Sequence, residues 1–493
     1  MLFNSLRFLA FFPCVVLVYF LLPRKVRWYW LLVTSYVFYM GWNAAYALLL
    51  ATSTVLTYLC GLALGAVGQR GGGGRKATLQ KRGILAACLV ANLAILFFFK
   101  YYDFATESIT AVMGFFGAAY TPPAFDVLLP VGISFYTFQA IGYTIDVYRK
   151  DITPERNLFR YALFVSFFPQ LVAGPIERSR NILPQLSVPH DFSFERLRSG
   201  LLLMLWGYFQ KMVVADRLST FVTGAFDGYA TQGKLALLTA LVFFAFQIYC
   251  DFASYSNIAI GTAHILGIEL MQNFNAPYLS RNIQDFWRRW HISLSTWFRD
   301  YVYFPLGGSR HGRLRTALNT MVVFLLSGLW HGANWTFVLW GLLHGGYLVL
   351  GQNTREARKR LYAKLHLRHD AWYAVAWQTF FTFALVCFTY VFFRADTLSV
   401  AFGYLSQVAT GPLHAPGFFE LGMDAPDFIV SLLGIAAVFT ADILSQKTSV
   451  LKNIDTGSAP LRWTASLIGI AVILVFGIYG EGFVEKPFIY FQF

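Results

Sequence analysis

Long apolar runs separated by short polar loops dominate the chain and predict a bundle of membrane helices. The first five runs cover residues 8–22, 29–42, 45–67, 84–99 and 112–118, and later runs cover 126–148, 201–214, 372–393, 428–444 and 465–479. A helix needs about 20 predominantly apolar residues to cross a bilayer. The longer runs therefore predict spanning helices, and the shorter ones predict tilted or re-entrant partners.

Residues 159–198 predict a segment that enters the membrane without crossing it. The apolar run 159–172 is too short to cross and ends in Ala173-Gly174-Pro175. Proline and glycine at membrane depth are tolerated only where protein or a cavity satisfies the backbone, so we expect a re-entrant segment. Residues 176–198 are amphipathic and charged, which predicts a position at the membrane interface.

The run 235–268 is too long for one simple crossing. A continuous helix of this length would measure about 50 Å, whereas the hydrocarbon layer is about 30 Å thick. We therefore expect the helix to break within residues 249–257, which include Asp251, Ser256 and Asn257. A polar cluster at a broken helix either forms an interior binding site or supplies hydrogen bonds between helices. The sequence leaves both alternatives open.

Composition agrees with the pattern of apolar runs. The chain has 493 residues, of which 57% are hydrophobic and 13% charged, and its mean hydropathy is +0.53. Soluble domains carry about 25% charged residues, so this is an integral membrane protein. The net charge of +14 comes from 39 basic and 25 acidic residues. Because the basic residues lie in short loops, they indicate contact with membrane lipids at an anionic leaflet rather than with nucleic acid.

The distribution of basic loops predicts an orientation in the membrane. Arg24, Lys25 and Arg27 follow the first run, and two further basic loops cover residues 353–370 and 447–462. Positively charged loops face the cytoplasm, so we expect both termini on the exoplasmic side. The sequence shows no internal repeat and no large soluble part, and it predicts one all-α polytopic membrane domain over residues 1–493.

The stretch 321–346, MVVFLLSGLWHGANWTFVLWGLLHGG, carries the first candidate for chemistry. Its titratable side chains are His331 and His344, and His331 has apolar residues on both sides. An ionisable group at membrane depth is costly and is a functional candidate by default. Histidine also titrates near neutral pH and can act as a general base. The alternative is a core histidine whose ring is satisfied by a neighbouring carbonyl.

Residues 284–299, QDFWRRWHISLSTWFR, form a cationic and aromatic segment around His291. Its arginines are Arg288, Arg289 and Arg299. The segment is typical of a helix at the membrane interface, with aromatic rings at headgroup level. It would equally suit recognition of the phosphates of a nucleotide-bearing acyl donor. The chain has no His-Glu-x-x-His motif and no Gly-x-Ser-x-Gly elbow, and no metal site is indicated.

Several long motifs resemble those of one known family. They are PVGISFYTFQAIGYTIDVYR from Pro130, FPQLVAGPIERSR from Phe168, YCDFASYSNIAIG from Tyr249, DFWRRWHISLSTWFRDYVYFPLGG from Asp285, GLWHGANWTFVLWGLLHG from Gly328, and the terminal PFIYFQF. Together they resemble the membrane-bound O-acyltransferase superfamily, and in particular its bacterial branch that acetylates alginate, cellulose and peptidoglycan. Cys250, Ala253 and Asn257 depart from the usual residues of the third motif.

The resemblance implies a multi-helix fold in which re-entrant and broken helices form a funnel or tunnel. It implies that His331 is the catalytic histidine and that His291 occupies the second motif position. We also expect Arg288, Arg289 and Arg299 to contact the donor and Asp300 and Asn334 to orient neighbouring groups. Asp251, Ser256 and Asn257 complete the set of expected binding residues.

These observations predict a membrane O-acyltransferase of the bacterial inner membrane. It would take an acetyl group from a cytoplasmic thioester, with acetyl-CoA as the expected donor and no bound cofactor, and pass it to an exported polysaccharide such as alginate, cellulose or peptidoglycan. Transfer would be direct or through a periplasmic acetyltransferase partner. The alternative is a transporter, conduit or scaffold of a glycan-secretion complex that performs no chemistry of its own, because broken helices and buried polar groups also fit a conduit.

Overall fold

The computed structural model is helical, and the residues that it describes contain no strand. The described residues are 1–69, 74–123, 125, 129–366, 368, 370–415, 417–479 and 488–489. The all-α prediction is therefore confirmed. Residues 126–128, at the start of the expected run 126–148, and most of the terminal motif PFIYFQF lie outside the described residues. The chain divides into two units: unit 1 comprises Met1–Gly200 and Thr262–Met271, and unit 2 comprises Leu201–Gly261 and Gln272–Phe493.

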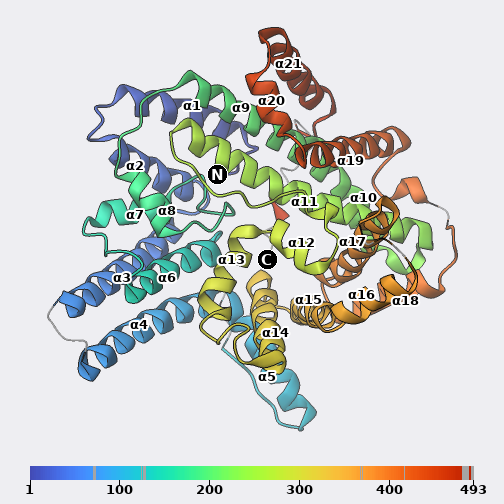
Figure 1. The fold of residues 1–493 in the computed structure, drawn as a ribbon, viewed down its shortest axis with the longest axis horizontal. Coiled ribbons are helices and arrows are strands. Elements are labelled where there is room, and N and C mark those ends of the chain that lie inside the picture. The colour runs from blue at the N-terminus through green and yellow to red at the C-terminus, as the bar shows by residue number, and fades with distance from the viewer. Residues whose placement is uncertain are drawn as a thin grey trace. The chain divides into compact units, whose positions relative to one another are not determined.

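Unit 1 is built mainly from the first eight helices (Figure 1). They are α1 (Leu6–Leu21), α2 (Arg27–Met40), α3 (Ala44–Gln69), α4 (Arg75–Leu96), α5 (Tyr102–Phe115), α6 (Ile133–Arg149), α7 (Leu158–Ser166) and α8 (Ser179–Leu186). A π-helical segment joins α4 to α5, so the expected separate run 84–99 and the first residues of the run 112–118 lie in one helical stretch, Arg75–Phe115. Two further helices, α9 (Phe194–Tyr208) and α11 (Lys234–Ile265), contribute to both units.

The short run 159–172 forms a nine-residue helix, α7, followed by buried non-helical backbone. The side chains of Gln139 and Gln170 both donate to the carbonyl of Phe164, at 2.7 and 3.0 Å. Residues 161–178 are buried, so protein groups rather than water satisfy this backbone. Protein covers the irregular end of this short helix, as non-helical backbone at membrane depth requires, and the expected re-entrant position of the segment stays a prediction.

Unit 2 contains the remaining helices. They are α10 (Asp216–Asp227), α12 (Ile283–Arg289), α13 (Ile292–Phe298), α14 (Gly312–His331), α15 (Trp335–Asn353), α16 (Arg355–Lys364), α17 (Trp372–Arg394), α18 (Leu398–Thr410), α19 (Ala425–Ser445), α20 (Val450–Thr456) and α21 (Ala459–Phe476). Further π-helical segments cover Phe209–Ala215 and Arg299–Tyr303, and short 3-10 turns cover Tyr229–Thr231, Pro277–Leu279 and Phe418–Glu420.

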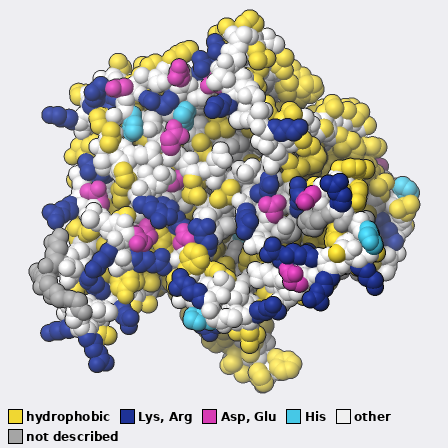
Figure 2. Space-filling model, viewed as in Figure 1, with side chains coloured by type: hydrophobic (Ala, Val, Ile, Leu, Met, Phe, Trp, Pro, Cys, Tyr) yellow, Lys and Arg dark blue, Asp and Glu magenta, His cyan; other side chains and the backbone are white. Residues whose placement is uncertain are grey.

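Six helical stretches of the described residues are long and apolar enough to cross a membrane. They are Ala44–Gly68, Arg75–Phe115, Lys234–Ile265, Trp372–Arg394, Ala425–Ser445 and Ala459–Phe476. None of the apolar window of α21 is buried by the protein, and hydrophobic side chains gather over α19 and α21 in Figure 2. Apolar surface of this kind needs lipid around it, so the protein is a polytopic membrane protein.

The predicted break in the run 235–268 is wrong, because α11 continues unbroken from Lys234 to Ile265. Protein buries 72% of its apolar window. A helix that is covered by protein for most of its length is not limited by the thickness of the surrounding hydrocarbon. Its polar residues are accommodated by tertiary contacts instead of by a break, as described for the candidate site below.

The apolar stretch 321–346 is also not a single span. It turns at Gly332 and forms the antiparallel pair α14 and α15, which lie side by side (Figure 1). The two helices approach closely at two glycines: a Cβ atom on Gly328 would overlap the carbonyl oxygen of Phe337, and one on Gly341 would overlap that of Phe324. The close approach of these backbones thus depends on residues without side chains.

We expect Gly328→Ala to destabilise the protein by about 1–3 kcal/mol, because the added methyl group meets backbone that cannot rotate away. The matched control is Gly346→Ala on α15, where an added Cβ has no neighbour within 4 Å among the described residues. That change should leave the free energy of unfolding unchanged or raise it by up to about 1 kcal/mol, since alanine has a higher helix propensity than glycine. Thermal unfolding in detergent compares the two variants, and equal melting temperatures would contradict the packing argument.

Candidate active site

His331 is the last residue of α14, at the point where the chain turns into α15. The turn ends at Asn334, whose side-chain oxygen accepts a hydrogen bond from the backbone N–H of Thr336 at 3.0 Å and so caps α15. The amide nitrogen of Asn334 donates to the carbonyl of Asp396 at 2.8 Å. Asn334 therefore fixes the backbone beside His331 and ties the turn to the segment between α17 and α18.

The ring of His331 lies in an aromatic enclosure and is 3% exposed. Its centroid lies 4.9 Å from that of Trp340 and 5.4 Å from that of Phe393, both edge to face. Trp330 packs against it from the preceding residue at 5.1 Å. These rings exclude bulk water and hold the imidazole in one orientation, which is the condition for a positioned general base.

His291 comes from another part of unit 2 and faces the same enclosure. It is fully buried, and the centroids of its ring and that of His331 are 6.3 Å apart. Its backbone has a positive φ of 44°, which is uncommon for a residue with a side chain and marks the corner between α12 and α13. The structure therefore brings together the two histidines that the sequence singled out.

Asn273 holds His291 in place. Its side-chain oxygen lies 3.2 Å from Nδ1 of His291 and accepts hydrogen bonds from the backbone N–H of Ser293 at 3.2 Å and from its hydroxyl at 2.9 Å. Because the backbone N–H of Ser293 can only donate, the atom that it faces is the oxygen of Asn273. Nδ1 of the neutral His291 ring must then carry the proton, which leaves the lone pair on Nε2.

We expect Asn273→Leu to destabilise the protein by about 1–3 kcal/mol for each buried donor that it leaves without an acceptor. Acyl transfer should fall as well, because His291 loses the bond that orients it. The matched control is Asn275→Leu, since the side chain of Asn275 is exposed. Melting temperature and initial rate report the two effects, and similar values for both variants would exclude the proposed role of Asn273.

Burial lowers the pKa of His291, which lies outside the candidate spans, to about 3. An unfolded histidine has a pKa of about 6.5, so the folded state favours the neutral ring. The stability that this difference carries is fully present above pH 6.5 and is lost as the pH falls toward 3, by up to about 1.4 kcal/mol for each pH unit. We expect wild type to lose more thermal stability than His291→Gln between pH 7 and pH 4.5; equal losses would contradict the burial effect.

The cationic residues of the segment 284–299 differ in their surroundings. Arg289 is engaged, because its Nε lies 3.1 Å from a carboxylate oxygen of Asp285 and its Nη1 donates to the side-chain oxygen of Gln446 at 2.9 Å. Arg299 forms an ion pair with Asp300 at 2.8 Å, and Arg288 is exposed. Arg288 and the half-exposed Arg299 can reach a ligand in solution, whereas Arg289 ties α12 to the end of α19.

The polar residues of α11 act as contacts between elements of unit 2. Asp251 accepts from Lys211 at 2.6 Å and from the backbone N–H of Ile489 at 2.6 Å. Asn257 donates to the side chain of Gln210 at 2.8 Å. Ser256 accepts from Asn273 at 3.3 Å and thereby supports His291 indirectly. These contacts favour hydrogen bonding between helices over a substrate site at a broken helix.

His344, the second histidine of the stretch 321–346, has two side-chain partners. The indole N–H of Trp287 donates to its Nδ1 at 3.2 Å, so its Nε2 carries the proton and faces the hydroxyl of Thr389 at 3.0 Å. This is a core histidine with a structural role. Sequence reasoning missed Asn273, Lys211 and Phe393, because nothing in the local pattern indicates which distant residue will contact a histidine.

Comparison with known proteins adds independent information. The family model described as "MBOAT, membrane-bound O-acyltransferase family" matches residues 152–394, which include both histidines. A protein of Pseudomonas putida named "Probable alginate O-acetylase AlgI" is 36% identical over the full length of both chains. A peptidoglycan O-acetyltransferase of Helicobacter pylori is 33% identical over 87% of this chain and 83% of its own. A teichoic acid D-alanyltransferase of Bacillus subtilis is 29% identical over 55% of this chain and 70% of its own.

Proposed function

Since the chain belongs to the membrane-bound O-acyltransferase family and is an O-acyltransferase, we propose that it transfers an acetyl group from a cytoplasmic thioester to an exported polysaccharide. The observation that carries the proposal is the pair of buried histidines, His331 and His291, whose ring centroids are 6.3 Å apart. Acetyl-CoA is the proposed donor, and it acts as a substrate rather than as a bound cofactor.

His331 is the proposed general base. Its imidazole removes the proton from an acceptor hydroxyl, and the oxygen attacks the carbonyl carbon of the thioester. The carbon–sulfur bond then breaks, and the leaving thiolate takes the proton from His331. The aromatic enclosure supports this role because a neutral imidazole loses little by being kept from water, and because a fixed base within hydrogen-bond reach contributes typically 10²–10⁴ in rate.

His291 is the proposed positioning residue. With its Nδ1 proton donated to Asn273, the Nε2 lone pair can accept a hydrogen bond from the acceptor hydroxyl or from a protonated His331. This role needs a neutral ring, and burial keeps the pKa of His291 well below neutral pH. A mutation at Asn273 should therefore alter the reaction through His291 without contact with substrate.

Arg288 and Arg299 are the proposed contacts for the phosphates of the donor. Both are exposed, and a guanidinium group matches phosphate geometry. Arg289, Asp300 and Asn334 would position the surrounding segments. Asp251, Ser256 and Asn257 would act through the support they give to α11 and to Asn273.

The acceptor is proposed to be alginate or peptidoglycan, in line with the substrates named for the relatives from Pseudomonas putida and Helicobacter pylori. Cellulose is a further candidate from the resemblance of the motifs. The acetyl group passes to the glycan directly or through a periplasmic acetyltransferase partner. The family relationship favours this enzyme over a conduit or scaffold that performs no chemistry.

We place the protein in the bacterial inner membrane, with the basic loops in the cytoplasm and both termini on the exoplasmic side. Arg24, Lys25 and Arg27 after α1 and the basic α16 support this orientation. A reporter that is active only outside the cytoplasm, fused ahead of α1, should be active. An inactive exoplasmic reporter together with an active cytoplasmic one would reverse the orientation.

The test is transfer of label from radiolabelled acetyl-CoA to alginate and to peptidoglycan fragments, in proteoliposomes that contain the purified protein with and without the candidate periplasmic partner. We expect label in the glycan with wild type and none with empty liposomes. Acetyl-CoA consumption that never labels either glycan would overturn the assignment of the acceptor. Glycan labelling that proceeds equally without the protein would overturn the proposed function.

A further inference from the structure

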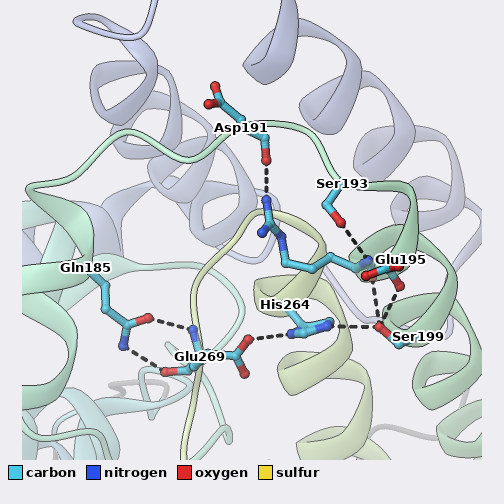
Figure 3. Close-up of polar contacts among 8 residues, drawn as sticks. Gln185, Asp191, Ser193, Glu195, Ser199, His264 and Glu269 are labelled. Atoms are coloured by element: carbon cyan, nitrogen blue, oxygen red, sulfur yellow. Dashed lines mark hydrogen bonds and ion pairs between the residues drawn. The ribbon is translucent and has the colours of Figure 1, made fainter. Parts of the chain in front are cut away.

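A second group of three side chains with catalytic geometry lies in unit 1, apart from the two histidines described above. The hydroxyl oxygen of Ser199 on α9 lies 2.9 Å from Nε2 of His264 near the end of α11. Nδ1 of the same ring lies 2.6 Å from a carboxylate oxygen of Glu269. Figure 3 shows the three side chains in line, with His264 between the hydroxyl and the carboxylate. A nucleophile, a base and a group that orients the base are recognised by this geometry rather than by sequence order.

The end of α11 explains how Glu269 reaches His264. Backbone N–H groups of Gly267 and Ile268 donate to the carbonyls of His264 and Ala263, both at 2.9 Å, which closes the helix in a tight C-terminal turn. Gly267 has a φ of +88°, and a Cβ there would lie 2.6 Å from the side chain of His190. Glycine is therefore required, and the turn folds the chain back so that Glu269 faces the ring.

Gln185 on α8 fixes the backbone of Glu269 from the other side. Its amide nitrogen donates to the carbonyl of Glu269 at 3.1 Å, and its oxygen accepts from the N–H of Glu269 at 2.8 Å. Figure 3 shows this pair of parallel contacts. His190 Nε2 lies 2.9 Å from the carbonyl of Gln185 and adds a further contact. The carboxylate of an otherwise exposed residue is thus held at a defined position.

The partners of His264 decide which of its nitrogens accepts. The hydrogen bond with His264 lowers the pKa of Glu269, so this carboxyl group is ionised at neutral pH and can only accept. Nδ1 must then donate, and Nε2 of the neutral ring accepts. The hydroxyl oxygen of Ser199 lies 2.9 Å from this nitrogen and 2.8 Å from the carbonyl oxygen of Glu195. The O–H bond can therefore rotate to donate to either acceptor.

The group is open to a substrate and lies beside positive charge. The side chains of His264 and Glu269 are 26% and 62% exposed, and Ser199 is half-buried. Arg196 lies one turn before Ser199 on the same face of α9. The segment that precedes α9 is joined to the basic end of α1, because Arg24 pairs with Asp191 at 2.7 Å. The basic loops mark the side of the membrane where thioester donors occur.

We propose that Ser199, His264 and Glu269 form a second acyl-transfer site, in which Ser199 takes an acyl group from a thioester. This inference rests on the proposed function in one respect, namely that the acyl donor is a thioester. The hydroxyl proton of Ser199 passes to Nε2 of His264 while the oxygen attacks the thioester carbonyl. An ester bond forms, the carbon–sulfur bond breaks, and His264 returns the proton to the leaving thiolate. Water or another hydroxyl then attacks the acyl carbon of the acyl-serine and gives its proton to His264. The bond between the acyl carbon and the Ser199 oxygen breaks, and His264 returns the proton to that oxygen, which restores the site.

The first test uses the purified full-length chain in lipid nanodiscs with radiolabelled acetyl-CoA, a short reaction time and acid quenching, followed by peptide mass spectrometry. We expect an acetyl ester on Ser199 in wild type and at least about tenfold less of it in His264→Gln. The total label on the protein should fall by at least about tenfold in Ser199→Ala. The matched control is Ser187→Ala. Ser187 also donates to a carbonyl one turn earlier, at 2.9 Å, but its hydroxyl has no histidine contact among the described residues. Labelling of Ser199→Ala equal to wild type would overturn the proposal.

The variant His331→Ala separates this inference from the proposed function. We expect it to keep the ester on Ser199 and to lose glycan acetylation. No ester on Ser199 in wild type and in His331→Ala, with glycan acetylation intact in wild type, would overturn the second site alone. An ester on Ser199 together with undiminished glycan acetylation in His331→Ala would overturn the role of His331 alone.

A second measurement does not depend on the identity of the donor. In Ser199→Cys, the thiol would face His264, and the imidazole should increase the thiolate fraction at pH 7. We expect iodoacetamide to alkylate this residue at least about tenfold faster than the more exposed cysteine of Ser187→Cys, and the added His264→Gln change should remove the difference. Alkylation no faster than at position 187 would overturn the proposal.

Discussion

Replacing His331 by alanine should reduce acyl transfer by about 10²–10⁴, because the acceptor hydroxyl loses its general base. His331→Gln should be impaired to a similar extent, since an amide preserves size and some hydrogen bonding but cannot take up a proton at neutral pH. The measurement is the initial rate of label transfer from acetyl-CoA at matched amounts of folded protein. Retention of more than about a tenth of the wild-type rate in both variants would exclude the catalytic role.

His344→Gln is the matched control for this experiment. His344 is also a buried histidine of the α14–α15 pair, and its ring lies 4.8 Å from that of Trp340, which also contacts His331. Because Trp287 and Thr389 occupy both of its nitrogens, we expect this change to lower the melting temperature while the rate per folded molecule falls less than tenfold. A loss of rate as large as that of His331→Ala would mean that the two buried histidines of α14 and α15 are equally important for acyl transfer.

Lys211→Met should give the largest loss of stability, about 3–5 kcal/mol, because it leaves two buried carboxylates without their cation. The side chain of Lys211 is 1% exposed, and its ammonium nitrogen lies 2.6 Å from a carboxylate oxygen of Asp251 and 2.9 Å from one of Asp216. It also packs over the ring of Phe488 at 4.4 Å. Thermal unfolding in detergent measures the effect, and the described contact between Asp251 and Ile489 should be weakened as well.

A compensating variant tests whether charge is the cause. Lys211→Met combined with Asp251→Asn and Asp216→Asn removes the buried charges together, and replacing a complete buried ion group is often neutral. We expect this triple variant to recover part of the melting temperature that Lys211→Met loses. If the triple variant melts at the same temperature as Lys211→Met or below it, lost packing rather than unbalanced charge would explain the effect.

Local patterns were sufficient for much of the fold. Apolar runs near 45–67, 372–393 and 428–444 correspond to α3, α17 and α19, because the length and hydropathy of a run depend on no distant residue. The run 159–172 likewise indicated a segment too short to cross, although its helix, α7, ends at Ser166, before the proline and glycine at residues 173–175. The composition identified a membrane protein for the same reason, since the cost of burying charge in lipid applies to every sequence.

Local patterns failed where a distant residue decides what a polar group does. The residues Asp251, Ser256 and Asn257 indicated a break in α11, but Lys211, Asn273 and Gln210 satisfy their side chains and the helix continues. In the same way, the apolar stretch around His331 has the composition of one span. In the structure it turns at Gly332, and Gly328 and Gly341 let the two helices pack closely.

The sequence by itself determined that this is an all-α membrane protein, and its motifs indicated the acyltransferase family and the histidines His331 and His291. Only the tertiary structure decided that the two rings share one aromatic enclosure, that Asn273 sets the tautomer of His291, and that Ser199, His264 and Glu269 align in unit 1. The physical reason is that the two kinds of property depend on residues at different separations along the chain. Hydropathy is a property of each residue along the chain, whereas a hydrogen bond or a proton transfer requires particular atoms from distant segments to lie within about 3 Å of one another.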